Sequence, residues 1–293
     1  MEQMLPVVYV AFLVWVIWWD LRTLTIPAEI TLFGTLAGLI AVTFFGNAVL
    51  PQQGGHSLNF YSGLEPLLGT YAKHDVAELL LGLLVICFWF LACIHYPARF
   101  SRGFLVATRL WLRHAYQNAR RRLHWLSLLF VIWFTLTIWA WKGPAWDNLF
   151  NSLVGCGFGM LTCWICRIGL SLAARQEALG FGDVHLQGMI GAWGGWQICF
   201  LNPVVGVIVL LPFVVLLVLY ACRKGGRAFP FAFGPFLAIG AIATHFGWWK
   251  IAPVYAVATE LTCDFGLQSA VLVVGSLFFF MCFLLGVLLR VRR

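Results

Sequence analysis

Long apolar segments follow one another through most of the sequence, and this succession constrains the fold more than any single motif. A membrane-spanning helix needs about 17–25 predominantly apolar residues. Only 10% of the 293 residues are charged and 62% are hydrophobic, which is too apolar for a soluble domain. The sequence therefore predicts an all-α, polytopic membrane bundle of about nine transmembrane helices, at approximately 4–20, 29–46, 77–96, 125–142, 149–171, 184–201, 203–222, 231–249 and 268–289.

Two of these segments carry further expectations. Residues 1–19 resemble a signal peptide only in being apolar, because a basic n-region and a small-residue cleavage site are missing, so a retained first helix is predicted. Only Asn202-Pro203 separates 184–201 from 203–222, and this dipeptide is a turn signal. A tight helical hairpin that turns at Asn202-Pro203 is therefore predicted.

The distribution of basic residues predicts the orientation, since Lys and Arg are enriched in cytoplasmic loops. The segment 97–124 contains seven arginines and no acidic residue, and the C-terminal end is also basic. With nine spans, these segments place the N-terminus outside and the C-terminus in the cytoplasm. Asp20, at the end of the first span, and Asp183, at the start of the sixth, then reach the same cytoplasmic side.

The net charge of +8 is attributed to these cytoplasmic loops, and no nucleic-acid partner is expected. The basic loop 97–124 is expected to contact anionic membrane lipid, with a contact to substrate or secretion machinery as the alternative. Of the nine cysteines, only Cys163 and Cys166 form a C-x-x-C pair, whereas a structural zinc site needs about four ligands. Neither a metal nor another cofactor is expected.

The run Gly180-Phe181-Gly182-Asp183 is the candidate catalytic segment. A carboxylate at the end of a membrane helix is costly unless it is paired or hydrated, and the glycines allow a tight bend. Two carboxylates brought close together can share a proton and activate a water molecule, one as general base and the other polarising a scissile carbonyl. The alternative is that Asp183 is only the N-cap of the sixth span. Because Asp20 reaches the same membrane depth, an aspartic protease is favoured.

Three stretches resemble the type IV prepilin peptidases, which are GxGD membrane aspartic proteases. The first comprises Gly180–Leu186 and Gly191–Gln197, the second is Asp20 with Ile26-Pro27, and the third is Phe233–Leu237, which looks like the family's F-G-P-F-L element. The resemblance covers residues 12–45 and 149–245. It implies that Asp20 and Asp183 are the catalytic pair, and that residues of the matched stretches shape the site: Gly180, Gly182, Pro27, Gly234 and Pro235. From its position two residues after Asp183, His185 is expected to tune the pKa of Asp183 or to contact substrate, with a plain interfacial residue as the alternative.

The same resemblance implies an activity. The protein would remove the basic leader of prepilins or pseudopilins at the cytoplasmic face of the bacterial inner membrane. Pilus or secretion machinery are the partners implied, and the sequence leaves the oligomeric state open. Bifunctional members carry a cytoplasmic domain with two C-x-x-C pairs; because this sequence lacks them, a peptidase without N-methyltransferase activity is predicted.

The chain departs from the family pattern at three places. His185 stands where the family commonly has Lys. Residues 75–142 are interpreted as an insertion with two extra spans around the basic loop 97–124, and residues 268–293 as an extra C-terminal span. All of these belong to a single membrane-embedded domain, 1–293.

Two other functions remain open. In a proton- or cation-coupled transporter, Asp20 and Asp183 would bind the ion, but acids near the bilayer midplane and an inverted repeat would be expected. An inactive scaffold of a pilus or secretion apparatus would keep the fold without the chemistry. Among the remaining charged residues, Glu29 is expected in the first turn of the second span, and Arg167 is expected to snorkel to the interface.

Overall fold

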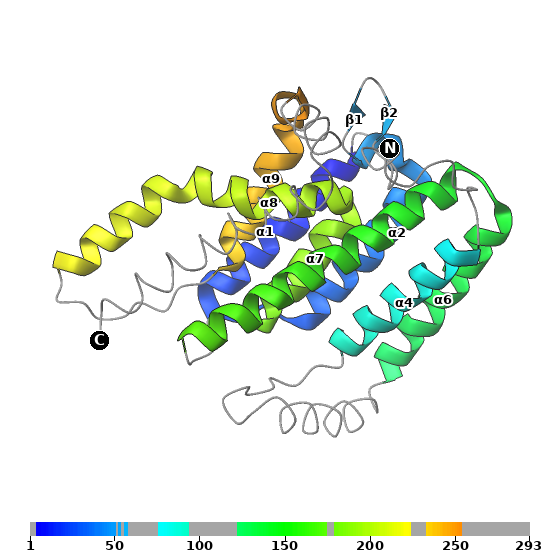
Figure 1. Cartoon of the computed structure of the whole chain (residues 1–293), viewed down its shortest axis with the longest axis horizontal. Coiled ribbons are helices and arrows are strands. Elements are labelled where there is room, and N and C mark those ends of the chain that lie inside the picture. Colours follow the sequence, from blue (N-terminus) through cyan, green and yellow to red (C-terminus); the bar gives the residue numbers. More distant parts are fainter. Residues whose placement is uncertain are drawn as a thin grey trace.

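Helices make up nearly all of the residues that the computed structural model describes (Figure 1). It describes residues 4–50, 52–53, 56–57, 76–93, 122–174, 179–223 and 233–253. The helices are α1 (Leu5–Thr23), α2 (Ala28–Val49), α4 (Val76–Cys93), α6 (Arg122–Trp141), α7 (Pro144–Ala174), α8 (Phe181–Arg223) and α9 (Gly234–Phe246). Two two-residue strands, β1 (Gln52–Gln53) and β2 (His56–Ser57), pair antiparallel. The predicted helical architecture is confirmed, and this short pairing is a minor addition to it.

Three described segments are long and apolar enough to cross a membrane: Leu5–Thr23, Ala28–Gly46 and Pro144–Gly169. Shorter apolar helices occur at Val76–Phe90, Trp125–Trp141 and Gly234–Phe246. The chain is therefore a multi-pass membrane protein. The count of nine spans stays a prediction, because the segment 268–289 and the basic segment as far as residue 121 lie outside the described residues.

The helical hairpin exists, but its turn lies at Gly195 and not at Asn202-Pro203. Asn202 Nδ2 donates to Gln187 Oε1 at 2.8 Å, although 15 residues of straight helix would separate the two by about 22 Å. The chain must therefore reverse between them, and Gly195 is the residue in α8 with non-helical torsions, φ 74° and ψ 179°. This positive φ suits glycine, because a side chain would be strained there. The predicted turn at Asn202-Pro203 was wrong, since both residues lie within the helical second limb.

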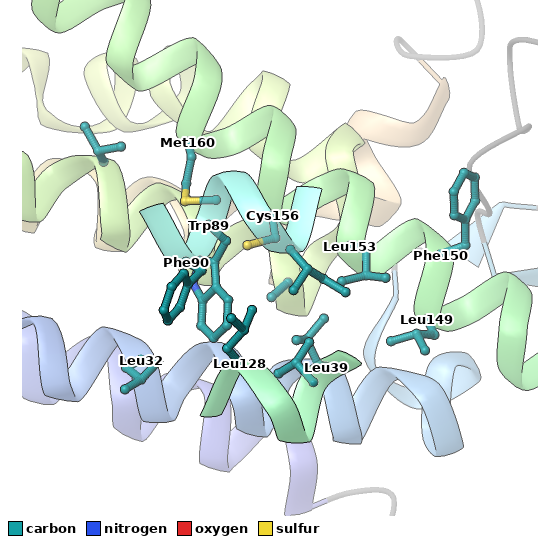
Figure 2. Close-up of a cluster of buried hydrophobic side chains, with 14 of the residues drawn as sticks. Leu32, Leu39, Trp89, Phe90, Leu128, Leu149, Phe150, Leu153, Cys156 and Met160 are labelled. Carbon is teal, nitrogen blue, oxygen red and sulfur yellow. The ribbon is translucent and has the colours of Figure 1, made fainter. Parts of the chain in front are cut away.

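Buried side chains form two clusters on either side of α2 and α8. Figure 2 shows the first, which joins α2, α4, α6 and α7 through residues such as Leu39, Trp89, Leu128 and Leu153. Trp146 on α7 also donates through Nε1 to Glu78 Oε2 on α4 at 2.7 Å. The helices α4 and α6 also pack on each other and lie side by side along one flank of the bundle (Figure 1).

The second cluster joins α1, α2, α8 and α9 and includes Tyr9, Leu13, Leu186 and Leu237. Trp193 on the first limb of α8 belongs to it, and its Nε1 donates to the carbonyl of Gly34 on α2 at 2.8 Å. Trp193 is therefore a packing residue in the interior of the bundle. This cluster fixes α1, α8 and α9 relative to one another, and those helices carry the candidate site.

Candidate active site

Asp20 lies at the end of the buried stripe of α1. The buried residues of this helix are Tyr9, Leu13, Val16 and Asp20, and their spacing of three and four residues puts them on one face. Asp20 therefore points into the bundle with the apolar residues and is 4% exposed. Its carboxylate accepts a hydrogen bond from the backbone N–H of Gly234. That N–H is in the first turn of α9, where no carbonyl of the same helix can accept it.

Asp183 lies in the first turn of α8 and is 6% exposed. Its Oδ2 accepts the backbone N–H of Gly180 at 3.0 Å. This is the arm of a capping box in which an acid at the third helical position satisfies the N–H of the N-cap residue. Asp183 thus does cap its helix, but from inside the first turn, and the N-cap itself is Gly180.

Ile26 lies between the N-terminal turns of α8 and α9, next to both aspartates. A Cβ on Gly182 would be 2.7 Å from Ile26 Cβ, and one on Gly234 would be 2.9 Å from Ile26 Cδ1. The α1–α2 connection therefore approaches α8 and α9 closely at two glycines. Asp20 and Asp183 lie close enough for their charges to act on each other.

The local backbone explains why the connection passes this point. Leu24 ends α1 in the left-handed conformation, φ 54°, and its N–H donates to the carbonyl of Asp20 at 2.8 Å. Pro27 follows in an extended conformation and is the N-cap of α2. Proline is common just after a helix end, because it cannot continue the helix. Ile26 is thereby held between two helices that end and begin within four residues, and Glu29 lies in the first turn of α2 as expected.

The other predicted residues are distributed around the pair. Gly180 and Gly234 border the carboxylates directly, Gly182 lies against Ile26, and Pro235 is buried in the first turn of α9. His185 is 6% exposed and packs edge-to-face on Phe181, with ring centroids 5.0 Å apart.

Arg167 was missed as a site residue, and the expectation that it snorkels was wrong. It is 3% exposed, and its Nε donates to the carbonyl of Leu179 at 3.1 Å. Its guanidinium carbon lies 5.2 Å from the centre of the Phe181 ring, and its charge acts on Asp183. A cation inside an otherwise apolar segment was the signal that could have found it, since such residues usually face the protein interior and a partner.

The arrangement suits acid–base chemistry. Two interacting carboxylates can share a proton, so that one acts as a base while the other acts as an acid. Each aspartate also accepts an N–H at a helix N-terminus, where the helix dipole favours negative charge. Within the described ranges, no group of three His, Cys, Asp or Glu side chains could hold a metal ion.

Several known proteins named prepilin leader peptidase/N-methyltransferase are similar in sequence to part of this chain. The protein from Pectobacterium carotovorum subsp. carotovorum is 38% identical over 118 residues, which is 40% of this chain and 38% of that protein. Those from Pseudomonas aeruginosa and Stutzerimonas stutzeri are 36% and 35% identical over 105 residues, 34% of either chain.

The matched region therefore spans little more than a third of these relatives. No family model matches the chain, and no solved structure does. The resemblance drawn from the sequence motifs is confirmed at this level: over about a third of its length, the chain is similar to the type IV prepilin peptidases.

Proposed function

We propose that the protein is a membrane aspartic endopeptidase that removes the basic leader from prepilin or pseudopilin-like proteins. One observation carries the proposal. Asp20 and Asp183 are 163 residues apart in the sequence, yet both carboxylates are buried at one site where their charges interact. Isolated acids are expensive in such surroundings, and a functional pair accounts for both. The names of the relatives support the same substrate class.

In the proposed mechanism, one aspartate removes a proton from water while the other, protonated, polarises the scissile carbonyl. The N–H groups of Gly180 and Gly234 orient the two carboxylates from the ends of α8 and α9. The apolar helix of the substrate remains in the bilayer, so a protease that cuts beside it must be embedded there too.

The proposed function also implies where the site lies in the membrane and which parts of the chain are additions to the peptidase. The site would face the cytoplasm at the bacterial inner membrane, with pilus or secretion machinery and membrane lipid as partners. The stretch 75–142 would be an insertion in a single domain, 1–293, with 268–293 as an added span. In support, α4 and α6 pack along α7, whereas the described site residues come from α1, the α1–α2 connection, α7, α8 and α9.

We also propose that the chain lacks N-methyltransferase activity, because its sequence has a single C-x-x-C pair, Cys163 and Cys166. Supplying a radiolabelled methyl donor with the cleaved pilin tests this. Label in the new N-terminus would contradict it.

The experiment that tests the protease is leader cleavage by purified protein in lipid, with a prepilin encoded near its gene as substrate. Asp20→Asn and Asp183→Asn keep the side-chain shape but remove the acid, and each should lower the rate by about 100-fold or more. Asp147→Asn is the matched control, since Asp147 also lies in the first turn of a helix, at the far end of α7 from Arg167. It should cleave like the wild type.

The alternative outcomes are distinct. Full activity in either site variant would refute the carboxylate pair. If folded wild-type protein cleaves nothing, the transporter or the inactive scaffold becomes the better explanation, and ion flux into vesicles would be measured next.

A further inference from the structure

Arg167 contacts both sides of the glycine that precedes α8. Its Nε holds the carbonyl of Leu179 at 3.1 Å, and its guanidinium lies 5.2 Å from the ring centre of Phe181. Gly180 lies between these two residues, and its N–H in turn holds Asp183 Oδ2. One side chain from α7 thus fixes the turn from which the Asp183 carboxylate is presented.

The charge of Arg167 also reaches Asp183. Asp183 interacts electrostatically with Asp20 on α1 and with Arg167 and Cys163 on α7. Of these three, Arg167 is the one that carries a positive charge. A positive charge near a carboxylate favours its ionised form, whereas the charge of Asp20 opposes it. Arg167 is thus placed to balance the repulsion that a pair of buried acids creates.

Guanidinium chemistry explains why arginine suits this position. Its planar group can donate a hydrogen bond at its edge while its face lies on an aromatic ring. Phe181 is itself held by two further rings, because the ring centroids of His185 and Trp164 lie 5.0 Å and 6.2 Å from its own. The contact therefore rests on a fixed support rather than on a mobile ring.

We infer that Arg167 is a positioning residue for Asp183, which fixes the first turn of α8 through Leu179 and Phe181 and supplies the positive charge beside the acid pair. The inference rests on the proposed function, since it assigns Arg167 a part in the same cleavage.

The test compares kcat, KM and the pH profile of leader cleavage in three variants of the contact and one control variant. Arg167→Gln removes the charge, and kcat should fall by about 10- to 100-fold with KM within about 2-fold. The acid limb of the kcat profile should move up by about one pH unit. Arg167→Lys keeps the charge without the planar contact, so kcat should fall less and the limb should stay. Phe181→Leu removes the ring and should lower kcat without moving the limb.

Arg22→Gln is the matched control. Arg22 also lies over an aromatic ring, 4.1 Å from that of Trp18, but it is exposed on α1. Its loss should leave kcat and the pH profile unchanged. Wild-type kcat and pH profile in Arg167→Gln, with Asp183→Asn inactive, would overturn the inference and leave the proposed function intact. If Arg167→Gln does not fold, wild-type kcat in both Arg167→Lys and Phe181→Leu would overturn it equally.

A second readout does not depend on cleavage. The thermal midpoints of Arg167→Gln, Asp183→Asn and the double variant form a cycle, and non-additive shifts are expected because the two side chains interact. Additive shifts would overturn the inference even if the wild-type protein cleaves no prepilin. A non-additive cycle in an inactive wild type would uphold the contact and refute only the proposed function.

Discussion

Replacement of Gly234 by alanine would test the position of the Asp20 carboxylate rather than its mere presence. A Cβ at position 234 would lie 2.5 Å from Asp20 Oδ2 and 2.9 Å from Ile26 Cδ1. Ordinary van der Waals contact begins at 3.4 Å, so the carboxylate must retreat by about 0.9 Å, which is 3.4 minus 2.5 Å. Because both clashing atoms end flexible side chains, we expect them to move without unfolding the protein.

A displacement of about 1 Å at a reacting group can cost about 100-fold in rate, which corresponds to about 2.7 kcal/mol of transition-state stabilisation. We expect kcat/KM for leader cleavage by Gly234→Ala to fall by about that factor, while the thermal midpoint and the amount of protein in the membrane stay near the wild-type values. Gly169→Ala on α7 is the control, because a Cβ there meets nothing within 4 Å. It should cleave normally and gain up to about 1 kcal/mol of helix stability.

The assay is the initial rate of leader removal by purified protein in lipid, measured over a range of substrate concentrations. Wild-type kcat/KM in Gly234→Ala would refute the reasoning, because the observed position of Asp20 would then not matter for cleavage. An equal loss in Gly169→Ala would refute it as well, because the effect would then not depend on contact with Asp20.

Two further predictions concern the same site. Gly182→Ala should lower both thermal stability and cleavage, since its Cβ would meet Ile26 Cβ at 2.7 Å and Ile26 N at 3.2 Å, and these atoms can move only with the backbone. An unchanged melting curve would contradict this. Gly180→Ala should have a milder effect, because the nearest contact of its Cβ is a side-chain oxygen at 3.3 Å. Cleavage should have a bell-shaped pH profile, because acid protonates both carboxylates and removes the base, whereas alkali ionises both and removes the acid. A rate that stays flat over pH values of about 4 to 9 would count against a carboxylate pair.

The class of the fold could be predicted from the sequence because it depends on local properties. A segment of sufficient apolar length forms a helix in a bilayer, since every backbone polar group must be satisfied within it. The predicted span 125–142 agrees closely with the observed α6, Arg122–Trp141. The hairpin turn could not be placed in this way. Asn202-Pro203 is the stronger local turn signal, but the chain reverses at Gly195, where a positive φ is possible and where Asn151 and Gln197 lie within about 3 Å of the missing Cβ.

What the sequence alone determined is therefore a multi-pass helical bundle with acids at two helix ends, because length, hydropathy and residue type act along the chain. Only the tertiary structure decided which groups meet. It placed Ile26 between Gly182 and Gly234 and turned Arg167 toward the interior. It also showed that Asp183, in the first turn of α8, accepts the backbone N–H of Gly180. Apart from the local bond between Gly180 and Asp183, these contacts join different helices or their connections, and close packing selects them among many arrangements that satisfy the same apolar pattern.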